Sequence, residues 1–388
     1  MERIMPAVKN NQLVTGIFIA IFLMSFTIGG CSRENPKEVG YYIIDENLNI
    51  INPDTPFELE PGDFSKEGYT LGKGCNAQYM MNTKGEIISG PDDSYAGRNF
   101  GEDGYFKTGK GYYDKDFNLV VEIKYMDGDI APSRIGDAPK SFSKNGLAAA
   151  QVLRAKKNGT GMDKVWGYID NTGEFVIEPQ YKEAEDFGDN GYALVENMDD
   201  TFEFIDENGD VVSEKYSNAY SFSDNGLAFV CELDTKRAGY VNDNFEYVIE
   251  GDYNSEEPFA DNNLAVVTKK IDGKLRWGFI NEKGEQVIDF QFSAAPYGFV
   301  NGYCVVGKDG KWGFIDETGN YIFEKKFSRQ PNSFSEDGIA LVQDDNGLYG
   351  YIKTDGTWLL EPQFEKATDF SNGYAGVWLN KKQKLKKQ

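Results

Sequence analysis

The chain has 388 residues, 40% of them hydrophobic and 14% aromatic, which is the composition of a folded protein rather than a disordered one. Its formal net charge of −23 repels phosphate backbones and argues against nucleic-acid binding. The sequence contains no histidine, so it cannot form Ser-His-Asp or Cys-His catalytic arrangements or any zinc site that needs imidazole.

The first thirty residues predict a signal peptide. A positively charged start is followed by an apolar run at 13–28, which has the length of a signal-peptide core and is short for a membrane span. The run ends at Ile28-Gly29-Gly30-Cys31, which resembles the lipobox of bacterial lipoproteins. That resemblance implies cleavage before Cys31, a lipid on its sulfur and a place at the extracytoplasmic face of the cell membrane. An uncleaved N-terminal anchor is the alternative, and residues 31–40 form a polar tether.

Residues 41–380 contain nine copies of one unit. The clearest copy opens with Trp166-Gly167-Tyr168-Ile169-Asp170, and the opening recurs with a period of about 36 residues. Such a period predicts a repeat array whose units share a continuous core. The nine openings end at Asp45, Asn82, Asp114, Asp170, Asp206, Asn242, Asn281, Asp316 and Lys353. The structural signature is carried most clearly by Trp166, Gly167, Trp277, Gly278, Trp312, Gly313 and Gly350.

A second marker recurs in step with the first. It is an aromatic residue three or four positions before a glycine, as in Phe187 and Gly191, and an apolar strand follows it. In one copy Phe259 is followed by Asn263, and asparagine is the other residue that tolerates the left-handed conformation. Two markers in every copy indicate that the repeat is real.

Each unit predicts three strands. The signature strand (WGYID) is joined to the following strand (EFVIEP, 174–179) by an Asp/Asn-x-x-Gly turn, and the apolar strand comes after the second marker. A hairpin then joins the apolar strand to the next signature strand. One longer spacing indicates insertions around 126–139 and 154–163, which we expect to be surface loops.

The phase of the repeat bears on how the array ends. It leaves an unpaired signature strand at 41–44 and an unpaired apolar strand at 374–378. If the array curls into a ring, these two strands complete one unit and no bare edge remains. We therefore predict an all-β array of about nine three-stranded β-meander repeats, propeller-like or toroidal, with an open superhelical array as the alternative.

The opening Lys311-Trp312-Gly313-Phe314-Ile315-Asp316 and the run 178–181 (EPQY) resemble bacterial WG-repeat proteins, also called KWG repeats. The resemblance covers residues 41–380 and is most specific from 166 onward. It implies β-stranded repeats, often on exported proteins, with a binding or scaffold role. The family supplies no catalytic residues to carry over.

Two features of the repeats have chemical alternatives. The tryptophans could form an aromatic platform for sugars or peptides, but Phe202, Ala238 and Tyr349 take their place in other copies, which favours an apolar packing position. The acidic turns at 114–118 and 206–210 hint at calcium loops, but the same turn recurs with too few carboxylates, which favours ordinary turn chemistry. We therefore predict no metal and no cofactor.

The cysteines beyond Cys31 are Cys75, Cys231 and Cys304. An odd number at such wide spacing is not a disulfide framework, so we interpret them as buried small apolar residues, with one disulfide left open. The tail 381–388 contains five lysines and is expected to be a solvated end, with contact to anionic lipid or wall polymer as the alternative.

The sequence nominates no catalytic residue, and we expect no enzyme activity. The leading hypothesis is a lipid-anchored, extracytoplasmic binding or scaffold protein, held to the membrane through Cys31, that presents its repeats to an envelope protein or glycan. A carboxylate-dependent glycan hydrolase on a propeller-like body and a purely structural envelope protein are the alternatives. The oligomeric state stays open.

Overall fold

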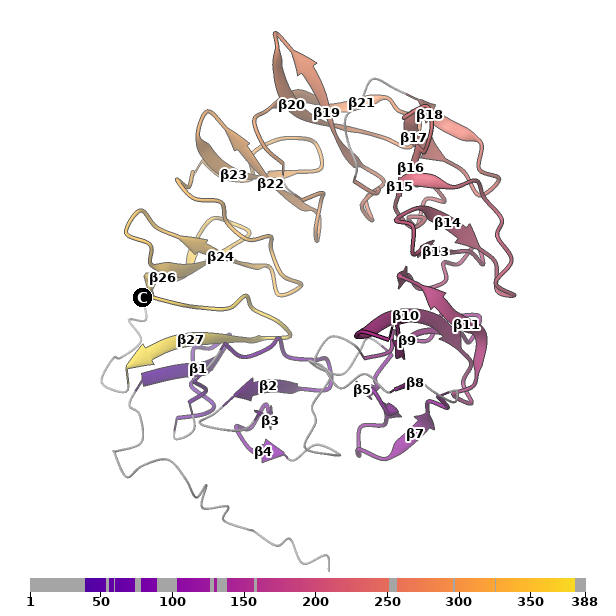
Figure 1. Ribbon diagram of the computed structural model, residues 1–388. Helices are drawn as coiled ribbons and strands as arrows, with labels where there is room; N and C mark the ends of the chain where they lie inside the picture. Colours follow the sequence, from indigo (N-terminus) through magenta and orange to yellow (C-terminus); the bar gives the residue numbers. More distant parts are fainter. Residues whose placement is uncertain are drawn as a thin grey trace, which may run out of the picture. The chain divides into compact units, whose positions relative to one another are not determined.

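The computed structural model describes residues 39–53, 56–58, 60–73, 78–88, 103–125, 129–130, 138–156, 159–250, 257–295, 297–324 and 326–380 (Figure 1). The chain divides into two units, 1–36 and 37–388, and the described residues all belong to the second. The predicted signal peptide, Cys31, Cys75, the lysine tail and most of the first insertion lie outside the described residues. Within the described ranges there is no helix with the length and hydrophobicity that crossing a membrane requires.

The described residues form 27 β-strands and no helix, so the all-β prediction is confirmed. Nine of these strands carry the signature, as the repeat period predicts. They are β1 (Val39–Asp45), β3 (Gln78–Asn82), β6 (Gly111–Tyr113), β10 (Met162–Ile169), β14 (Phe202–Ile205), β17 (Ala238–Val241), β20 (Lys274–Ile280), β23 (Lys311–Asp316) and β25 (Tyr349–Lys353).

Each signature strand pairs antiparallel with an apolar strand. The apolar strands are β2 (Tyr69–Lys73), β5 (Phe106–Thr108), β9 (Ala148–Ala155), β13 (Ala193–Glu196), β16 (Ala228–Glu232), β19 (Ala265–Ile271), β22 (Tyr303–Lys308), β24 (Ile339–Gln343) and β27 (Tyr374–Asn380).

The following strand lies on the other side of the signature strand and is complete in six repeats. These six are β4 (Ile87–Ile88), β7 (Leu119–Glu122), β11 (Phe175–Tyr181), β18 (Tyr247–Glu250), β21 (Gln286–Phe292) and β26 (Trp358–Phe364). In the other three repeats, isolated bridges take its place, such as Ile205 with Val211 and Ile315 with Tyr321.

The structure adds a fourth strand that the sequence did not predict. We call it the entry strand, because it comes after the following strand of one repeat and pairs with the apolar strand of the next. It is present as β8 (Asp129–Ile130), β12 (Glu183–Ala184) and β15 (Tyr216–Ala219), and as single bridges such as Ala294 with Gly307. The sheet β8-β9-β10-β11 shows the full order of entry, apolar, signature and following strands. A bridge from Phe202 to Tyr216 joins two such sheets into the seven-stranded β12–β18 sheet.

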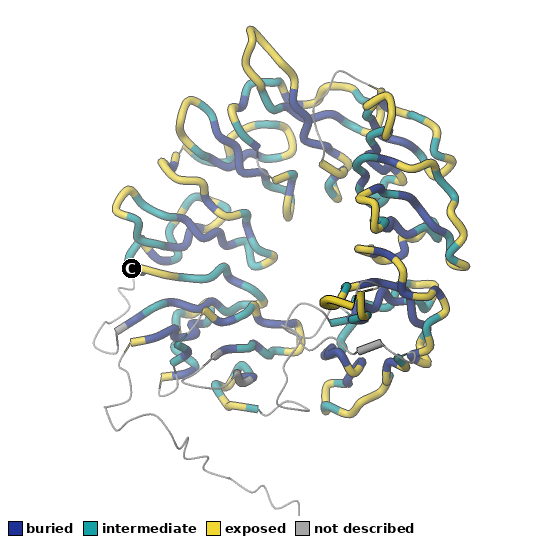
Figure 2. The backbone as a smooth tube through the Cα atoms, in the orientation of Figure 1, coloured by how far each residue is buried: buried dark blue, intermediate teal, exposed yellow. Residues whose placement is uncertain are grey.

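The signature explains how neighbouring sheets pack. Side chains at the third and fourth signature positions point to opposite faces of the strand, because successive residues of a strand alternate. Tyr168 at a third position packs with Ile205 at the fourth position of the next repeat, and Phe279 packs with Ile315 in the same way. All nine apolar clusters contain one such pair, so each sheet buries one face on each neighbour. In Figure 2 the strands are accordingly buried and the turns exposed.

The two ends of the array pair with each other. β1 and β27 are antiparallel over seven residues, from Val39 opposite Asn380 to Asp45 opposite Tyr374 (Figure 1). The apolar cluster at this junction contains Tyr351 and Ile44, which repeats the third-to-fourth packing found everywhere else. The last sheet is thus assembled from both ends of the array. This arrangement is the one that the propeller-like prediction requires, and no bare edge remains at either end.

The two sequence markers meet in space. The phenylalanine of the second marker packs on the aromatic ring at the third signature position, with Phe187 and Tyr168 4.8 Å apart between ring centroids. Seven repeats have an aromatic residue at that position, and in all seven the rings lie 4.4–5.0 Å apart. Asn263 adopts φ 60°, as expected for the residue that replaces glycine in the marker turn. This recurring ring contact explains why the markers repeat in step.

Candidate functional site

The signature tryptophans lie in packing positions. Trp166 is 5% exposed and belongs to an apolar cluster with Tyr168 and Ile177. Trp277 and Trp312 are half-buried and pack against two other clusters. Trp166 is too buried to offer a flat face to a ligand, and the other two rings pack against apolar clusters, so the packing interpretation is favoured over the aromatic platform.

The signature glycines let the following strand approach closely. A Cβ on Gly167 would lie 2.5 Å from the carbonyl oxygen of Ile177 and 2.6 Å from the nitrogen of Pro179, which is closer than atoms can pack. Added Cβ atoms on the other signature glycines would come within 2.5–2.8 Å of neighbouring atoms, and these glycines are Gly278, Gly313 and Gly350.

The acidic turns use their carboxylates internally. Asp206 accepts hydrogen bonds from the backbone N–H groups of Asn208 and Asp210, both at 2.9 Å. Hydrogen bonds from the Asn118 side chain and backbone lower the pKa of Asp114, with a further contribution from the backbone amide of Asp116. Among the described residues, no group of three acidic or cysteine side chains is arranged to hold a metal ion. The turns therefore serve as turns.

The two cysteines in the described residues, Cys231 and Cys304, form no disulfide. Cys304 is 1% exposed and Cys231 is half-buried, and both are free thiols in the described part of the chain. Burial raises the pKa of Cys304 to about 12, so its thiol is an inert apolar side chain at neutral pH.

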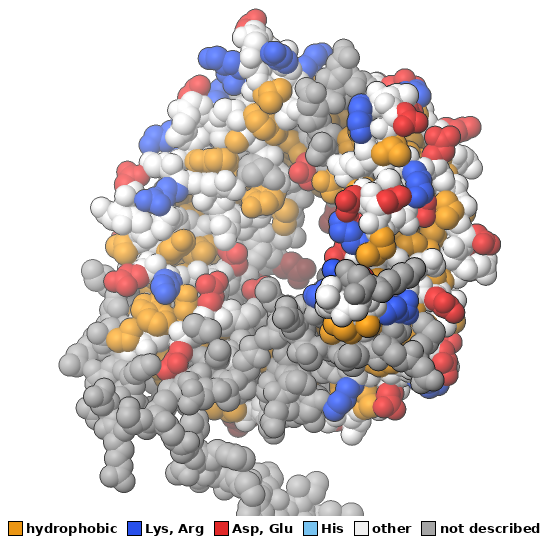
Figure 3. Space-filling model, viewed as in Figure 1, with side chains coloured by type: hydrophobic (Ala, Val, Ile, Leu, Met, Phe, Trp, Pro, Cys, Tyr) orange, Lys and Arg blue, Asp and Glu red, His pale blue; other side chains and the backbone are white. Residues whose placement is uncertain are grey.

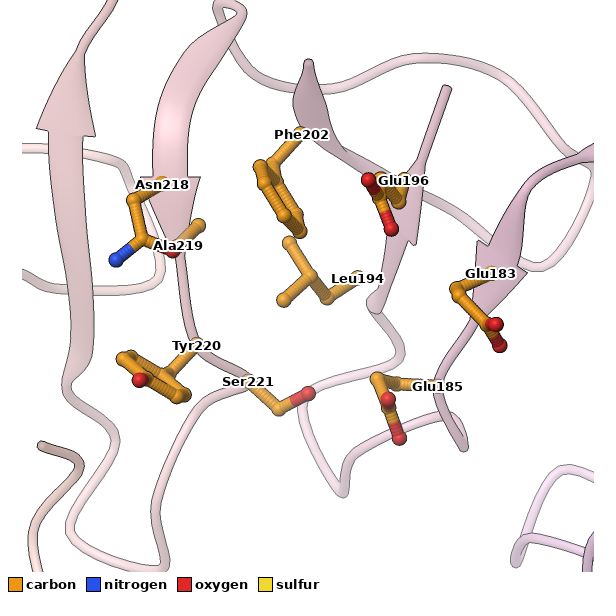
Figure 4. A pocket seen from close by; sticks show the side chains of 9 residues that line it. All are labelled: Glu183, Glu185, Leu194, Glu196, Phe202, Asn218, Ala219, Tyr220 and Ser221. Carbon is orange, nitrogen blue, oxygen red and sulfur yellow. The ribbon is translucent and has the colours of Figure 1, made fainter. Parts of the chain in front are cut away.

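A pocket of about 410 Å³ opens along the β12–β15 strands of the seven-stranded sheet (Figure 4). Its lining comes from the two entry strands β12 and β15, from β13 and from the start of β14. The lining residues are Glu183, Glu185, Leu194, Glu196, Phe202, Asn218, Ala219, Tyr220 and Ser221.

Three carboxylates form one side of this pocket. Glu183 lies directly opposite Glu196 in the β12–β13 pairing, and Glu185 is two residues further on the same face. Lys182 pairs with Glu196, and Lys140 pairs with Glu185. Glu183 makes no ion pair among the described residues, and although it stays in contact with solvent, the surrounding protein atoms raise its pKa. Because two cations face three carboxylates, this side of the pocket keeps a net negative charge.

The rest of the pocket is apolar or neutral. Figure 4 shows Leu194 and Phe202 between the glutamates and the wall formed by Asn218 and Tyr220. Leu194 is 5% exposed, so the floor is firmly packed. A side chain with an apolar stem and a cationic head would find both surfaces here, as lysine and arginine do elsewhere. Paired carboxylates can also do acid–base chemistry on a glycan.

Sequence reasoning missed this site. The only signal was the alternation Glu183-Ala184-Glu185, which puts two carboxylates on one face of a strand, but the strand itself was not predicted. Glu196 joins them only because the entry strand pairs with β13. Lys140 connects the site to the signature, because its Nζ also lies 5.9 Å from the centroid of the Trp166 ring.

The strand order, the nine packing clusters and the paired ends define an all-β repeat protein with propeller-like organisation. The family model "WG containing repeat" matches residues 166–200, 204–234, 239–274, 277–312, 312–347 and 349–382, which together exceed half of the chain. The chain therefore belongs to the WG-repeat family, as the sequence predicts.

Comparison with other proteins adds little beyond the family. No curated protein matches the chain by sequence. BamB from Moraxella catarrhalis is 12% identical over 90% of this chain and 98% of its own, with a TM-score of 0.33. Hsv2 from Kluyveromyces marxianus is 12% identical over 47% of this chain, with a TM-score of 0.30, and the chain spans 64% of that protein. At these TM-scores the likeness supports no statement about function.

Proposed function

We propose that this protein is a lipid-anchored, extracytoplasmic binding module that takes a basic side chain of a protein partner into the pocket of Glu183, Glu185 and Glu196. The observation that carries the proposal is the row of three carboxylates beside an apolar floor. A scaffold that holds several partners is compatible with the same surface, because a repeat array exposes many equivalent positions.

The charge of the protein supports a basic partner. The whole chain carries a formal net charge of −23, which attracts cationic surfaces over long range. At the pocket, Glu183 and Glu196 stand opposite each other although like charges across a strand pair are unfavourable. A bound ammonium or guanidinium group would relieve that repulsion, and the apolar floor would bury its stem.

The test is binding of a labelled oligolysine peptide to the full chain. The double variant Glu183→Gln/Glu185→Gln should bind about tenfold more weakly, since each carboxylate contributes up to about 1 kcal/mol. The matched control is Glu282→Gln/Glu317→Gln, which removes the same charge from two exposed turns. Equal weakening in both variants would mean that the peptide senses only net charge and that the pocket is not the site.

Anchoring has its own test. The proposal follows from the apolar run and the Cys31 motif, so a Cys31→Ala form should lose its lipid. We expect the acylated mass to disappear from the N-terminal peptide of that form in mass spectrometry. Acylation that persists in the Cys31→Ala form would overturn this part of the proposal.

One observation favours a glycan hydrolase as second candidate. The pocket brings together carboxylates in different settings, with the pKa of Glu183 raised by burial and Glu185 and Glu196 paired with lysines. Glycosidases use two carboxyl groups whose surroundings differ, so that one can act as the acid and the other as the base or nucleophile. Release of reducing sugar from envelope glycan that disappears with Glu183→Gln would establish this activity. If no sugar is released by the unmodified protein, the binding function stands alone.

A further inference from the structure

The hairpin of β19 and β20 differs from the rest of this acidic protein. Its two strands run beyond the core to the turn at Asp272 and Gly273, and the last residues before and after the turn are exposed (Figures 1 and 2). Four cationic side chains lie in eight residues, at Lys269, Lys270, Lys274 and Arg276. Figure 3 shows blue side chains gathered at the top of the view, around a red one at the tip.

These cations have no acidic partners among the described residues. Arg276 donates only to the carbonyl of Leu275, at 3.3 Å, and lies directly opposite Lys269 in the strand pairing. Like charges facing each other across a strand pair are unfavourable. In the β16–β17 hairpin, by contrast, Arg237 forms ion pairs with Glu232 and Glu250. With Asp272 as the one carboxylate of residues 269–276, this hairpin keeps a net positive charge, and no ion pair holds its four cations within the described residues.

Two exposed aliphatic side chains lie among the cations. Ile271 is 39% exposed and stands opposite Lys274, and Leu275 is 48% exposed and stands opposite Lys270. A soluble polyanion would bind the cations alone and would make no use of the exposed aliphatic side chains. Cations that surround exposed aliphatic side chains at the end of a projecting element suit the boundary between lipid headgroups and acyl chains.

The tip of this hairpin lies at the end of the sheet where the signature strand begins. Every signature strand except β1 begins at such a hairpin tip, and β20 begins at Lys274. β1 is itself a signature strand, so its start at Val39 is the equivalent end of the terminal sheet. The sequence with the predicted lipid attachment precedes Val39, and the lysine-rich sequence follows Asn380, which pairs with Val39.

We propose that the β19–β20 hairpin contacts an anionic lipid membrane through its four cations, with Ile271 and Leu275 entering the interface. Each cation close to an anionic leaflet strengthens binding about fivefold. The contact would hold the array against the membrane surface at its seventh repeat, three repeats from β1 across the β1–β27 junction, independently of the pocket. It would give the protein a second attachment besides the predicted lipid.

The experiment is hydrogen exchange on the full chain reconstituted in vesicles of phosphatidylcholine, with or without phosphatidylglycerol. We expect the amides of residues 269–276 to exchange more slowly only in the vesicles that contain phosphatidylglycerol, and high salt to abolish the difference. The amides of the β16–β17 tip, residues 232–237, should exchange equally in both vesicles. The variant Lys269→Gln/Lys274→Gln should weaken the contact about thirtyfold and lose the protection.

Two outcomes would overturn the proposal. One is equal exchange at 269–276 in both vesicles. The other is protection by soluble polyphosphate in the phosphatidylcholine vesicles without any protection by phosphatidylglycerol, which would assign the hairpin to an anionic polymer. Both substituted lysines are exposed, so the variant should keep the unfolding midpoint of the parent protein.

Discussion

Pairing of β1 with β27 makes the stability of the array depend on a residue near its start. Ile44 is fully buried, in a cluster with Tyr351, Leu360 and Val377 from the last repeats. Truncating a buried isoleucine to alanine costs about 2–5 kcal/mol, from lost burial and from the cavity left behind. Ile44→Ala should therefore destabilise the whole array by about 3 kcal/mol, although the residue lies more than 300 positions from its partners.

The assay is urea unfolding of the full chain, followed by fluorescence and circular dichroism. The matched control is Ile280→Ala, which occupies the same signature position at an internal junction and is also fully buried. A second control is Val176→Ala at a side chain that is 49% exposed, where the change should stay within about 0.5 kcal/mol. Closure predicts that Ile44→Ala behaves like Ile280→Ala. If it behaves instead like Val176→Ala, the two ends do not pack and the reasoning is refuted.

Three further predictions concern the repeats and the cysteines. Gly167→Ala should cost about 1–3 kcal/mol, because its Cβ meets the following strand, whereas Gly298→Ala, with nothing nearer than 3.7 Å, should be close to neutral in the same unfolding assay. Hydrogen bonds from the Thr172 hydroxyl and nearby backbone amides lower the pKa of Asp170. The carboxylate therefore stabilises the folded state above the unfolded pKa of 3.8, and this stabilisation is lost as the pH falls. Asp170→Asn should reduce the loss of stability measured between about pH 4 and pH 2. Iodoacetamide at neutral pH should alkylate native Cys304 at least about tenfold more slowly than Cys231, as peptide mass spectrometry would show.

The repeat architecture was predictable because it rests on local chemistry that every copy repeats. The Asp/Asn-x-x-Gly turns, the glycine or asparagine of the second marker and the alternating signature strand each have a short-range physical cause. Even the pairing of the ends followed from the phase of the repeat. Gly167 was predicted as a signature residue, and the structure shows why a glycine stands there, since an added Cβ would meet Ile177 and Pro179.

The entry strand could not be predicted for a physical reason. β12 has two residues and β15 has four, so neither is long enough to show a period. These strands are defined by their pairing with the next repeat, and their side chains follow no common pattern. The pocket could not be predicted for the same reason, since Glu183, Glu185 and Tyr220 all lie on or beside entry strands.

The signature residues are occupied by packing contacts, and this limits which residues can take part in the binding that we propose. The third and fourth signature positions are buried between sheets in every repeat, the following strand covers glycines such as Gly167, and the acidic turn of Asp206 satisfies its own amides. We therefore expect a ligand to meet positions that the markers leave free, among them the entry strands and the tips of the hairpins. Both features that we assign to partners lie there, the carboxylate pocket on β12 and β15 and the cationic tip of β19–β20. In this chain the residues that the signature needs for packing are therefore different from the residues that we assign to partners.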